Sequence, residues 1–391
     1  MRSAALAIFM TVEVACCIPC TTRAANDSNT IYYFIPTFID EFQTESQKAI
    51  EVVFGELGYS VISVDAEEKS NQQLAQLRKV ISRRPRAVIL NSVDFKTIMP
   101  AVHEAKQADI PVLVYDGRLF GSQPTFTSTS DAKDIGRSAA IVAKRLLNKR
   151  YNSEQGKILQ ISGDPSYAWS REANVGFLAE VFRTTQKIEV YSRPAMRWSG
   201  DSALKIASEQ LSGPNSDIDL VFCHAADLCE AVIRDVKQKG MKPAVINSKP
   251  SGRMAASGSG KFAGWDHLMF ISSNGAPIGL KHLRNGWQQA EIEQPLYAEV
   301  IGLARAMVAI ESKTLSDLKG RTCIIENSVG SITQEEDGLV LKFRGNTITA
   351  EEIDKEEARL PLWGELRRPR VTAADIKAQC STDNGSARPV N

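Results

Sequence analysis

The stretch Ile110-Pro-Val-Leu-Val-Tyr-Asp-Gly-Arg118 is the most informative part of this chain. It is a short apolar run of β-forming residues that ends abruptly in an acid, Asp116, and a base, Arg118. In an open α/β sheet, ligands bind beyond the carboxyl ends of the strands. A strand with this ending offers a hydroxyl acceptor and a planar donor fork to a small polar molecule. The alternative interpretation is a surface turn with an ordinary ion pair.

Similar apolar runs precede this one, at 31–35, 61–64 and 87–90, and a stretch of helical periodicity follows each of them. After the first run, Ile50, Val53, Phe54 and Leu57 recur at the i, i+3, i+4, i+7 spacing of an amphipathic helix. Alternation of strand and helix at this spacing predicts βαβ units and a parallel sheet.

The pattern restarts after residues 152–156, with new apolar runs at 158–161, 188–191 and 218–222. Two successive sets of βα units predict an α/β protein with two doubly wound parallel-sheet lobes. The stretch 242–264 is rich in Ser, Gly, Ala and Lys and has no clear periodicity, so we interpret it as an insertion or loop.

The overall composition is that of an ordinary globular protein. The 391 residues are 43% hydrophobic and 24% charged, with a formal net charge of +1. This length suffices for two domains. The nearly neutral charge gives no electrostatic reason to expect a nucleic acid or an anionic membrane as a partner.

The first 25 residues differ from the rest. Arg2 precedes an apolar run at 4–15, and small residues follow up to Ala24 and Ala25. This arrangement predicts a secretory signal at 1–25 and export to the periplasm. A lipid anchor at Cys16 is disfavoured, because Glu13 stands three residues before it, where lipoprotein signals carry an aliphatic residue.

Four cysteines remain outside this segment: Cys223, Cys229, Cys323 and Cys380. An even number is compatible with disulfides in an oxidising compartment. Four cysteines allow three connectivities, and nearness in sequence favours Cys223–Cys229 and Cys323–Cys380.

No catalytic motif stands out, and no cofactor motif is present. There is no GxSxG, no Walker loop, and no GxGxxG after a strand. The histidines also lack the spacing of metal ligands. They are His103, His224, His267 and His282. We therefore expect neither an enzyme nor a metal or cofactor site.

Several segments of the chain, taken in the order in which they occur, resemble segments of the bacterial periplasmic sugar-binding proteins of the ribose-binding type. These proteins are relatives of lactose-repressor effector domains. The similar segments lie within 31–353. They are 109–118, 128–139, 170–177, 273–279 and 293–297.

The resemblance implies two lobes that are joined by a hinge of three chain crossings and close on one ligand. It places the crossings near Ser130, Gln294 and Cys323. The N-terminal lobe would then comprise 30–130 and 295–322, and the C-terminal lobe 131–293 and 323–365. The residues 366–391 would form a polar tail.

Carried over by position, the resemblance also implies a set of ligand-binding residues that line the cleft. They are Asp40, Phe42, Asp116, Arg118, Arg171, Trp198, Asn274 and Gln294. Carboxylate and amide oxygens would accept from hydroxyls, Arg would donate, and Phe or Trp would stack on apolar C–H faces.

The chain departs from the family pattern at three positions of the predicted cleft. Ala225 and Ala226 stand where an Asn-Asp pair usually grips the sugar, and Asn274 replaces an Asp. His224 and Asp227 are candidates to compensate from the same loop. Loss of acidic acceptors beside two Arg predicts a sugar acid or sugar phosphate as ligand, with a neutral sugar or polyol as the alternative.

The preferred function is a periplasmic protein that delivers its small polar ligand to the membrane permease of an ABC importer. A sensor subunit that docks on a membrane receptor or histidine kinase has the same two-state hinge and is the alternative. An enzyme acting on a phosphate or carboxylate is disfavoured, and so is a DNA-binding regulator.

Overall fold

The computed structural model describes residues 27–39, 41–211, 217–244, 268–326, 328–353, 362–365, 371–378 and 380–381. Three of the predictions therefore lie outside the described residues. They concern the signal at 1–25, the ligand residue Asp40, and all of the insertion except 242–244.

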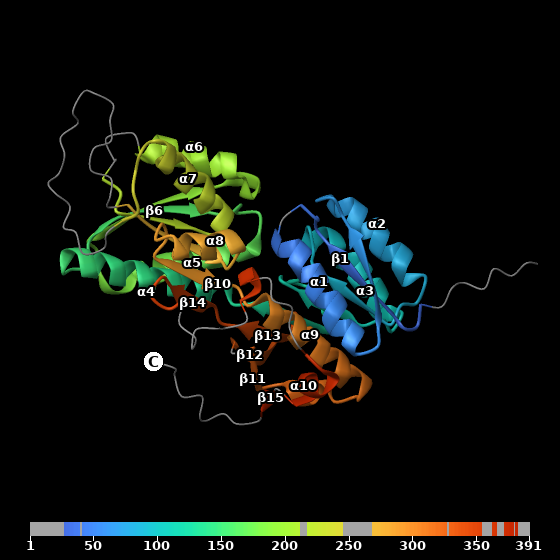
Figure 1. Cartoon of the computed structure of the whole chain (residues 1–391). Coiled ribbons are helices and arrows are strands. Elements are labelled where there is room, and N and C mark those ends of the chain that lie inside the picture. The colour runs from blue at the N-terminus through green and yellow to red at the C-terminus, as the bar shows by residue number, and fades with distance from the viewer. Residues whose placement is uncertain are drawn as a thin grey trace, which may run out of the picture.

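Two α/β lobes lie side by side (Figure 1), which confirms the predicted fold class. The N-terminal lobe begins with alternating strands and helices: β1 (Thr30–Ile35), α1 (Glu41–Glu56), β2 (Ser60–Asp65), α2 (Ser70–Ile81), β3 (Ala87–Leu90), α3 (Phe95–Gln107), β4 (Val112–Tyr115) and β5 (Phe126–Ser130). These strands pair in parallel, in the order β5-β4-β3-β1-β2. Every residue of β3 and β4 is buried, because helices cover both faces of the sheet.

The C-terminal lobe repeats this plan. Its elements are α4 (Ala132–Tyr151), β6 (Gly156–Ser162), α5 (Ala168–Thr184), β7 (Ile188–Pro194), the 3-10 helix η1 (Met196–Trp198), α6 (Gly200–Leu211), β8 (Leu220–Cys223), α7 (Ala226–Gln238), β9 (Met269–Asn274), α8 (Pro277–Arg284) and β10 (Ala290–Glu293). The strand order is β14-β10-β9-β8-β6-β7, in which only the edge strand β14 (Asn346–Thr349) is antiparallel.

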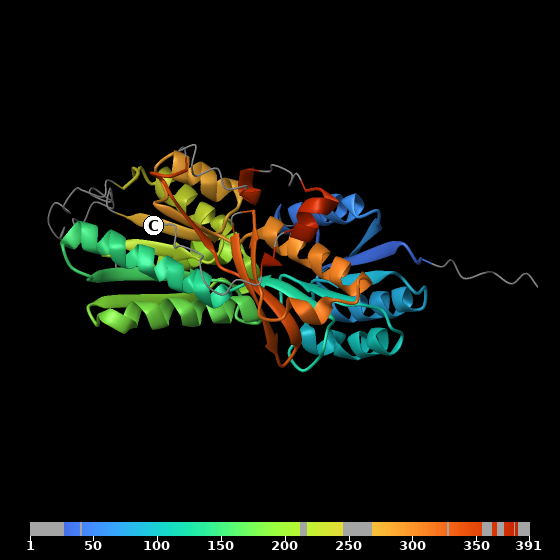
Figure 2. The same cartoon turned by 90° about the horizontal axis from the view of Figure 1, so that it is seen from below.

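The chain then returns to the N-terminal lobe. The elements of this lobe that follow are α9 (Leu296–Glu311), η2 (Leu315–Leu318), β11 (Thr322–Ile325), β12 (Ser328–Glu335), β13 (Gly338–Phe343), α10 (Ala373–Ala378) and β15 (Cys380–Ser381), and the 3-10 helix η4 (Trp363–Glu365) lies between the lobes (Figure 1). Figure 2 shows the orange and red strands of this part at the junction of the two lobes.

This C-terminal part corrects the predicted lobe boundaries. Residues 323–343 belong to the N-terminal lobe, because β13 pairs in parallel with β5 and continues its sheet through β12 and β11. The predicted polar tail is likewise partly folded. Ile376 is fully buried, and β15 pairs with β11 at the edge of the same sheet.

The chain passes between the lobes where β5 leads into α4, where β10 leads into α9 and where β13 leads into β14, and it passes back a fourth time between β14 of the C-terminal sheet and β15 of the N-terminal sheet. Ser130 and Gln294 lie at the first two crossings, as predicted. The third prediction, Cys323, is wrong, because this residue is inside β11 and the chain crosses at Arg344 and Gly345 instead.

Both disulfide pairings favoured from the sequence are present. Cys223–Cys229 closes the loop between β8 and α7. Cys323–Cys380 joins β11 to β15, opposite residues in an antiparallel pair.

Candidate functional site

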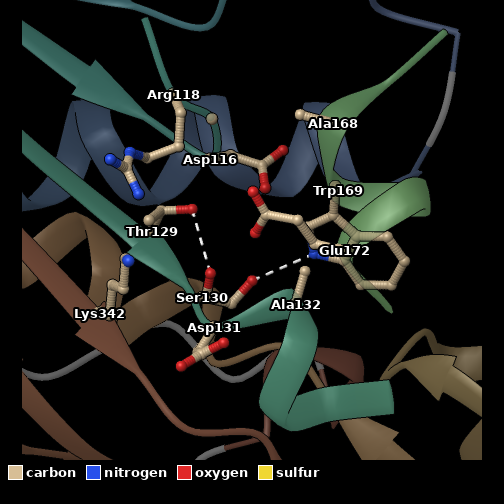
Figure 3. Close-up of a pocket in the computed structure, with 11 residues that line it drawn as sticks. Asp116, Arg118, Thr129, Ser130, Asp131, Ala132, Ala168, Trp169, Glu172 and Lys342 are labelled. Carbon is tan, nitrogen blue, oxygen red and sulfur yellow. Dashed lines mark hydrogen bonds between the residues drawn. The ribbon is translucent and has the colours of Figure 1, made fainter. Parts of the chain in front are cut away.

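A pocket lies between the lobes, next to the first crossing (Figure 3). Its walls come from the ends of β4 and β5, from β13, and from the first turns of α4 and α5. The lining residues are Asp116, Gly117, Arg118, Thr129, Ser130, Asp131, Ala132, Ala168, Trp169, Glu172 and Lys342. Because both lobes contribute, a ligand held here would contact the two lobes at once.

Asp116 is placed at the carboxyl end of β4, as the sequence predicts. Its backbone is in the left-handed region, with φ of 53°, and its main-chain N–H donates to Ser128 O. Its carboxylate accepts from the Gln294 amide at 2.5 Å and from the Asn91 amide at 3.4 Å. Uncommon backbone conformations that surrounding contacts hold in place are concentrated at functional sites.

Gln294 contacts the pocket through its hydrogen bond to Asp116. It is buried at the second crossing, where its main-chain N–H donates to Asn274 O. Its side chain links that crossing to the end of β4, so it lies on the hinge side of the site, as predicted.

The two cations of the pocket are neutralised by the β12–β13 hairpin. Arg118 donates from Nε to Asp337 at 2.7 Å, and its terminal nitrogen lies 2.5 Å from Asp337 and 2.7 Å from Glu335. Lys342 Nζ lies 2.7 Å from the other oxygen of Glu335. Arg118 also covers the ring of Phe120 at 4.8 Å. The donor fork predicted at Arg118 is therefore engaged within its own lobe.

The opposite wall is formed by the start of α5. The indole Nε1 of Trp169 donates to Ser130 Oγ at 3.2 Å, a hydrogen bond between the lobes that Figure 3 shows. Glu172 follows one helical turn later and points into the pocket. Burial raises the pKa of Glu172, and the positive charges of Arg118 and Lys342 oppose that shift.

Sequence reasoning missed Trp169, Glu172 and Lys342. The first two stand in 170–177 or directly before it, so the family-like segment itself was the available signal. Lys342 reaches the pocket only because β13 pairs in parallel with β5, and no local sequence pattern predicts this pairing.

Arg171, predicted to bind ligand, is instead exposed and faces its own loop. Its guanidinium donates to the carbonyl oxygens of Pro165 and Ser166, at 2.5 and 2.8 Å. It is not among the residues that line the pocket.

Trp198 and His224 lie behind Trp169 rather than in the pocket lining. The Trp198 ring is 5.9 Å from that of Trp169, and the His224 ring is at the same distance on another side. His224 is fully buried and bonded to the Gln160 amide at 3.0 Å, and burial lowers its pKa to about 3. It is thus a neutral residue that supports the indole.

Phe42, Asn274 and Asp227 lie on another side of the interlobe space. Phe42 is buried at the start of α1 and stacks on Tyr115, with ring centroids 6.5 Å apart. Asn274 ends β9 with a φ of 98°. Asp227 lies in the first turn of α7, and burial, together with the negative charge of Asp227, raises the pKa of Glu41 on the facing lobe.

Among the described residues, no group of three or more His, Cys, Asp or Glu side chains is arranged to hold a metal ion. In the same part of the chain, no helix has the length and apolar character needed to cross a membrane.

Residues 31–313 match the model of the periplasmic binding protein domain family, so the chain belongs to this family. The ribose import binding protein of Bacillus subtilis (strain 168) is 24% identical over 248 residues, which are 62% of this chain and 77% of that protein. The D-xylose-binding periplasmic protein of Escherichia coli (strain K12) is 23% identical over 267 residues, 65% of this chain and 69% of that one.

Solved structures share the fold at low identity. The myo-inositol binding protein of Caulobacter, bound to myo-inositol, has a TM-score of 0.64 and 17% identity, covering 83% of this chain and 95% of that one. The binding protein of the arabinose ABC transporter from Shewanella sp. ANA-3, bound to L-arabinofuranose, has a TM-score of 0.66 and 16% identity, covering 88% and 99%.

Proposed function

We propose that this protein is a periplasmic solute-binding protein, which captures a small, uncharged, polyhydroxylated ligand between its lobes and delivers it to an ABC importer. The observation that carries the proposal is the pocket at the first crossing, where Asp116 and Glu172 face one space from opposite lobes.

The chemistry of this pocket suits a sugar or polyol. The carboxylates of Asp116 and Glu172 accept hydrogen bonds from hydroxyl groups, and Ser130 and Thr129 add hydroxyls of their own. Trp169 offers an aromatic face to apolar C–H groups. This combination of a few polar groups with an apolar wall is typical of small-molecule sites.

The electrostatics favour a neutral ligand over the sugar acid that the sequence predicts. Arg118 and Lys342 are paired with Glu335 and Asp337, while Asp116, Asp131 and Glu172 also line the pocket. An anion entering this site would meet carboxylates, and its approach to Arg118 would compete with an existing two-point ion pair.

Ligand capture would work by a shift of population. A ligand that touches both walls binds the closed arrangement better than an open one, so it stabilises closure. Family members are binding proteins, and the B. subtilis relative is by name an import protein. These names support the importer and a periplasmic location, whereas no contact of the described residues favours the sensor alternative.

Isothermal titration calorimetry with D-arabinose, D-allose and myo-inositol tests the proposal. At least one of them should bind, and Glu172→Gln should weaken that binding about tenfold, because a charge-assisted hydrogen bond contributes on the order of 1.5–3 kcal/mol. Glu209→Gln, on the exposed surface of α6, is the matched control and should bind like the wild type. Equal affinity in both variants would show that Glu172 does not touch the ligand.

A further inference from the structure

The residues Leu362–Glu365 lie beyond the family match and come to rest between the two lobes. Figure 1 shows this short red helix, η4, between α8 of one lobe and α1 of the other. Its first residue, Trp363, is fully buried. This large aromatic side chain is therefore enclosed by both lobes.

On the C-terminal lobe, Trp363 is held by hydrogen bonds. Its indole Nε1 donates to Asn274 O at 2.7 Å, and its main-chain N–H donates to Glu293 Oε1 at 3.1 Å. The next residue, Gly364, approaches so closely that a Cβ there would lie 2.1 Å from Gly275 O. The segment is therefore fixed on the ends of β9 and β10.

On the N-terminal lobe, Trp363 makes an apolar contact. Its ring meets that of Phe42 edge to face, with centroids 5.4 Å apart, and Phe42 in turn stacks on Tyr115. The same apolar cluster includes Ala226 and Ala276 of the C-terminal lobe. Trp363 thus connects the two lobes through one side chain.

The contacts of Trp363 include two positions at which the resemblance predicts ligand-binding residues. Phe42 and Asn274 are positions that the resemblance assigns to the ligand, and Ala226 replaces a polar residue there. The polar groups beside Trp363 accept hydrogen bonds from it, Asn274 O from the indole and Glu293 Oε1 from the main-chain N–H. The side chain of Trp363 therefore occupies a region in which the resemblance predicts the ligand.

We propose that Trp363 is a built-in occupant of the interlobe cleft. It fills the side between Phe42 and the end of β9, it stabilises the closed arrangement of the lobes, and it restricts the ligand to the side of Asp116 and Trp169. The restriction of the ligand rests on the function proposed above, whereas the contact between the lobes does not.

The interlobe contact is tested by small-angle X-ray scattering of the full chain without added sugar. Trp363→Ala and Phe42→Ala should each enlarge the radius of gyration, because loss of one aromatic pair lowers the ratio of closed to open molecules about twofold to tenfold. The double variant should add little to the larger single effect. Trp287→Ala, a half-buried tryptophan of the C-terminal lobe that contacts Lys237, is the matched control and should leave the radius unchanged.

Far-UV circular dichroism identifies variants that fail to fold. If Trp363→Ala does not fold, Phe42→Ala removes the same contact from the other lobe, and Trp363→Phe keeps a ring in place. The radii of gyration of these two variants can then be compared instead. An unchanged radius of gyration in folded Phe42→Ala and Trp363 variants would overturn the proposal that this contact stabilises closure.

The restriction of the ligand is tested by the ratio of affinities for D-allose and D-ribose, whose pyranose rings differ by one hydroxymethyl group. Trp363→Ala should raise the relative affinity for D-allose at least about fivefold, since pockets discriminate groups of this size by roughly tenfold or more. An unchanged ratio would contradict the role of Trp363 in ligand choice. If neither sugar binds any variant, the proposed function fails, and the scattering result still decides the interlobe contact.

Discussion

At the scale of single residues, the charged groups of the pocket depend on partners that are far away in sequence. Arg118 is 219 residues from Asp337, yet the two form a two-point ion pair in which the Asp337 side chain is fully buried. Lys342 shares Glu335 with Arg118. A cation that is already paired has fewer donors free for an anionic ligand. An arginine at a family-like position therefore does not by itself establish a role in binding an anion.

Two buried glutamates at the end of β10 make stability depend on pH. Burial raises the pKa of Glu293 to about 8 and that of Glu291 to about 7. In the unfolded chain these groups lose their protons near 4.5. The folded protein therefore binds more protons between these values, and its free energy of unfolding must fall as the pH rises toward 8.

Glu293→Gln should remove part of this fall in the free energy of unfolding with rising pH. Between pH 6.5 and 8.5 the free energy of unfolding should fall less steeply than in the wild type, by up to about 1.4 kcal/mol per pH unit. His224 does not alter the slope in this pH range, because burial lowers its pKa from 6.5 to about 3 and its effect on stability is confined to pH values between these two. Urea unfolding at several pH values measures the slope, and identical slopes in the two proteins would show that Glu293 is ionised in the fold.

At the scale of elements, local patterns predicted the parallel strands well but not the last ones. Runs such as Val112–Tyr115 announce buried strands by composition alone, and their order follows from the βαβ rule. The βαβ rule does not assign the strands β11 to β13 to a sheet, because an antiparallel meander can join either one. Only the register of β13 on β5 decides this, and with it the position of Lys342.

Candidate site residues were predictable only where one strand carries them. Asp116 follows directly from the end of β4. Arg171 and Trp169 are two residues apart on α5, and sequence alone could not show which one faces the pocket. The position of Trp363 could not be predicted, because no local sequence pattern indicates that a residue so far along the chain returns to the cleft.

The pair α4–α5 is the tightest helix contact of the C-terminal lobe. A Cβ at Gly176 would lie 2.0 Å from the backbone oxygen of Lys133, so no larger residue fits without a shift. Gly176→Ala should lower the free energy of unfolding by about 1–3 kcal/mol, the usual cost of overpacking.

Gly55→Ala is the matched control for Gly176→Ala. A Cβ at Gly55, inside α1, would meet nothing within 4 Å. This substitution should stabilise the protein by about 0.5–1 kcal/mol, because alanine favours helix. Thermal unfolding of both variants compares the two effects, and equal changes would contradict the close helix contact.

At the scale of the whole molecule, two lobes share a pocket and the chain passes between them four times, with Trp363 on the fourth passage. Trp169 on one lobe bonds to Ser130 at the first crossing, and Gln294 at the second bonds to Asp116. The pocket is therefore bounded by groups that move with the hinge, which is what capture by closure requires.

The central claim, capture of an uncharged polyhydroxylated ligand between Asp116 and Glu172, is tested most directly by calorimetry on a sugar and its acid. D-galactose and D-galacturonate, titrated into the purified protein at neutral pH, share one pyranose ring and differ chiefly by one negative charge. The pocket described here predicts that the neutral sugar binds at least about tenfold more tightly, since its cations are already paired. Tighter binding of the acid, or no binding of either compound together with none of D-allose or myo-inositol, would contradict the account.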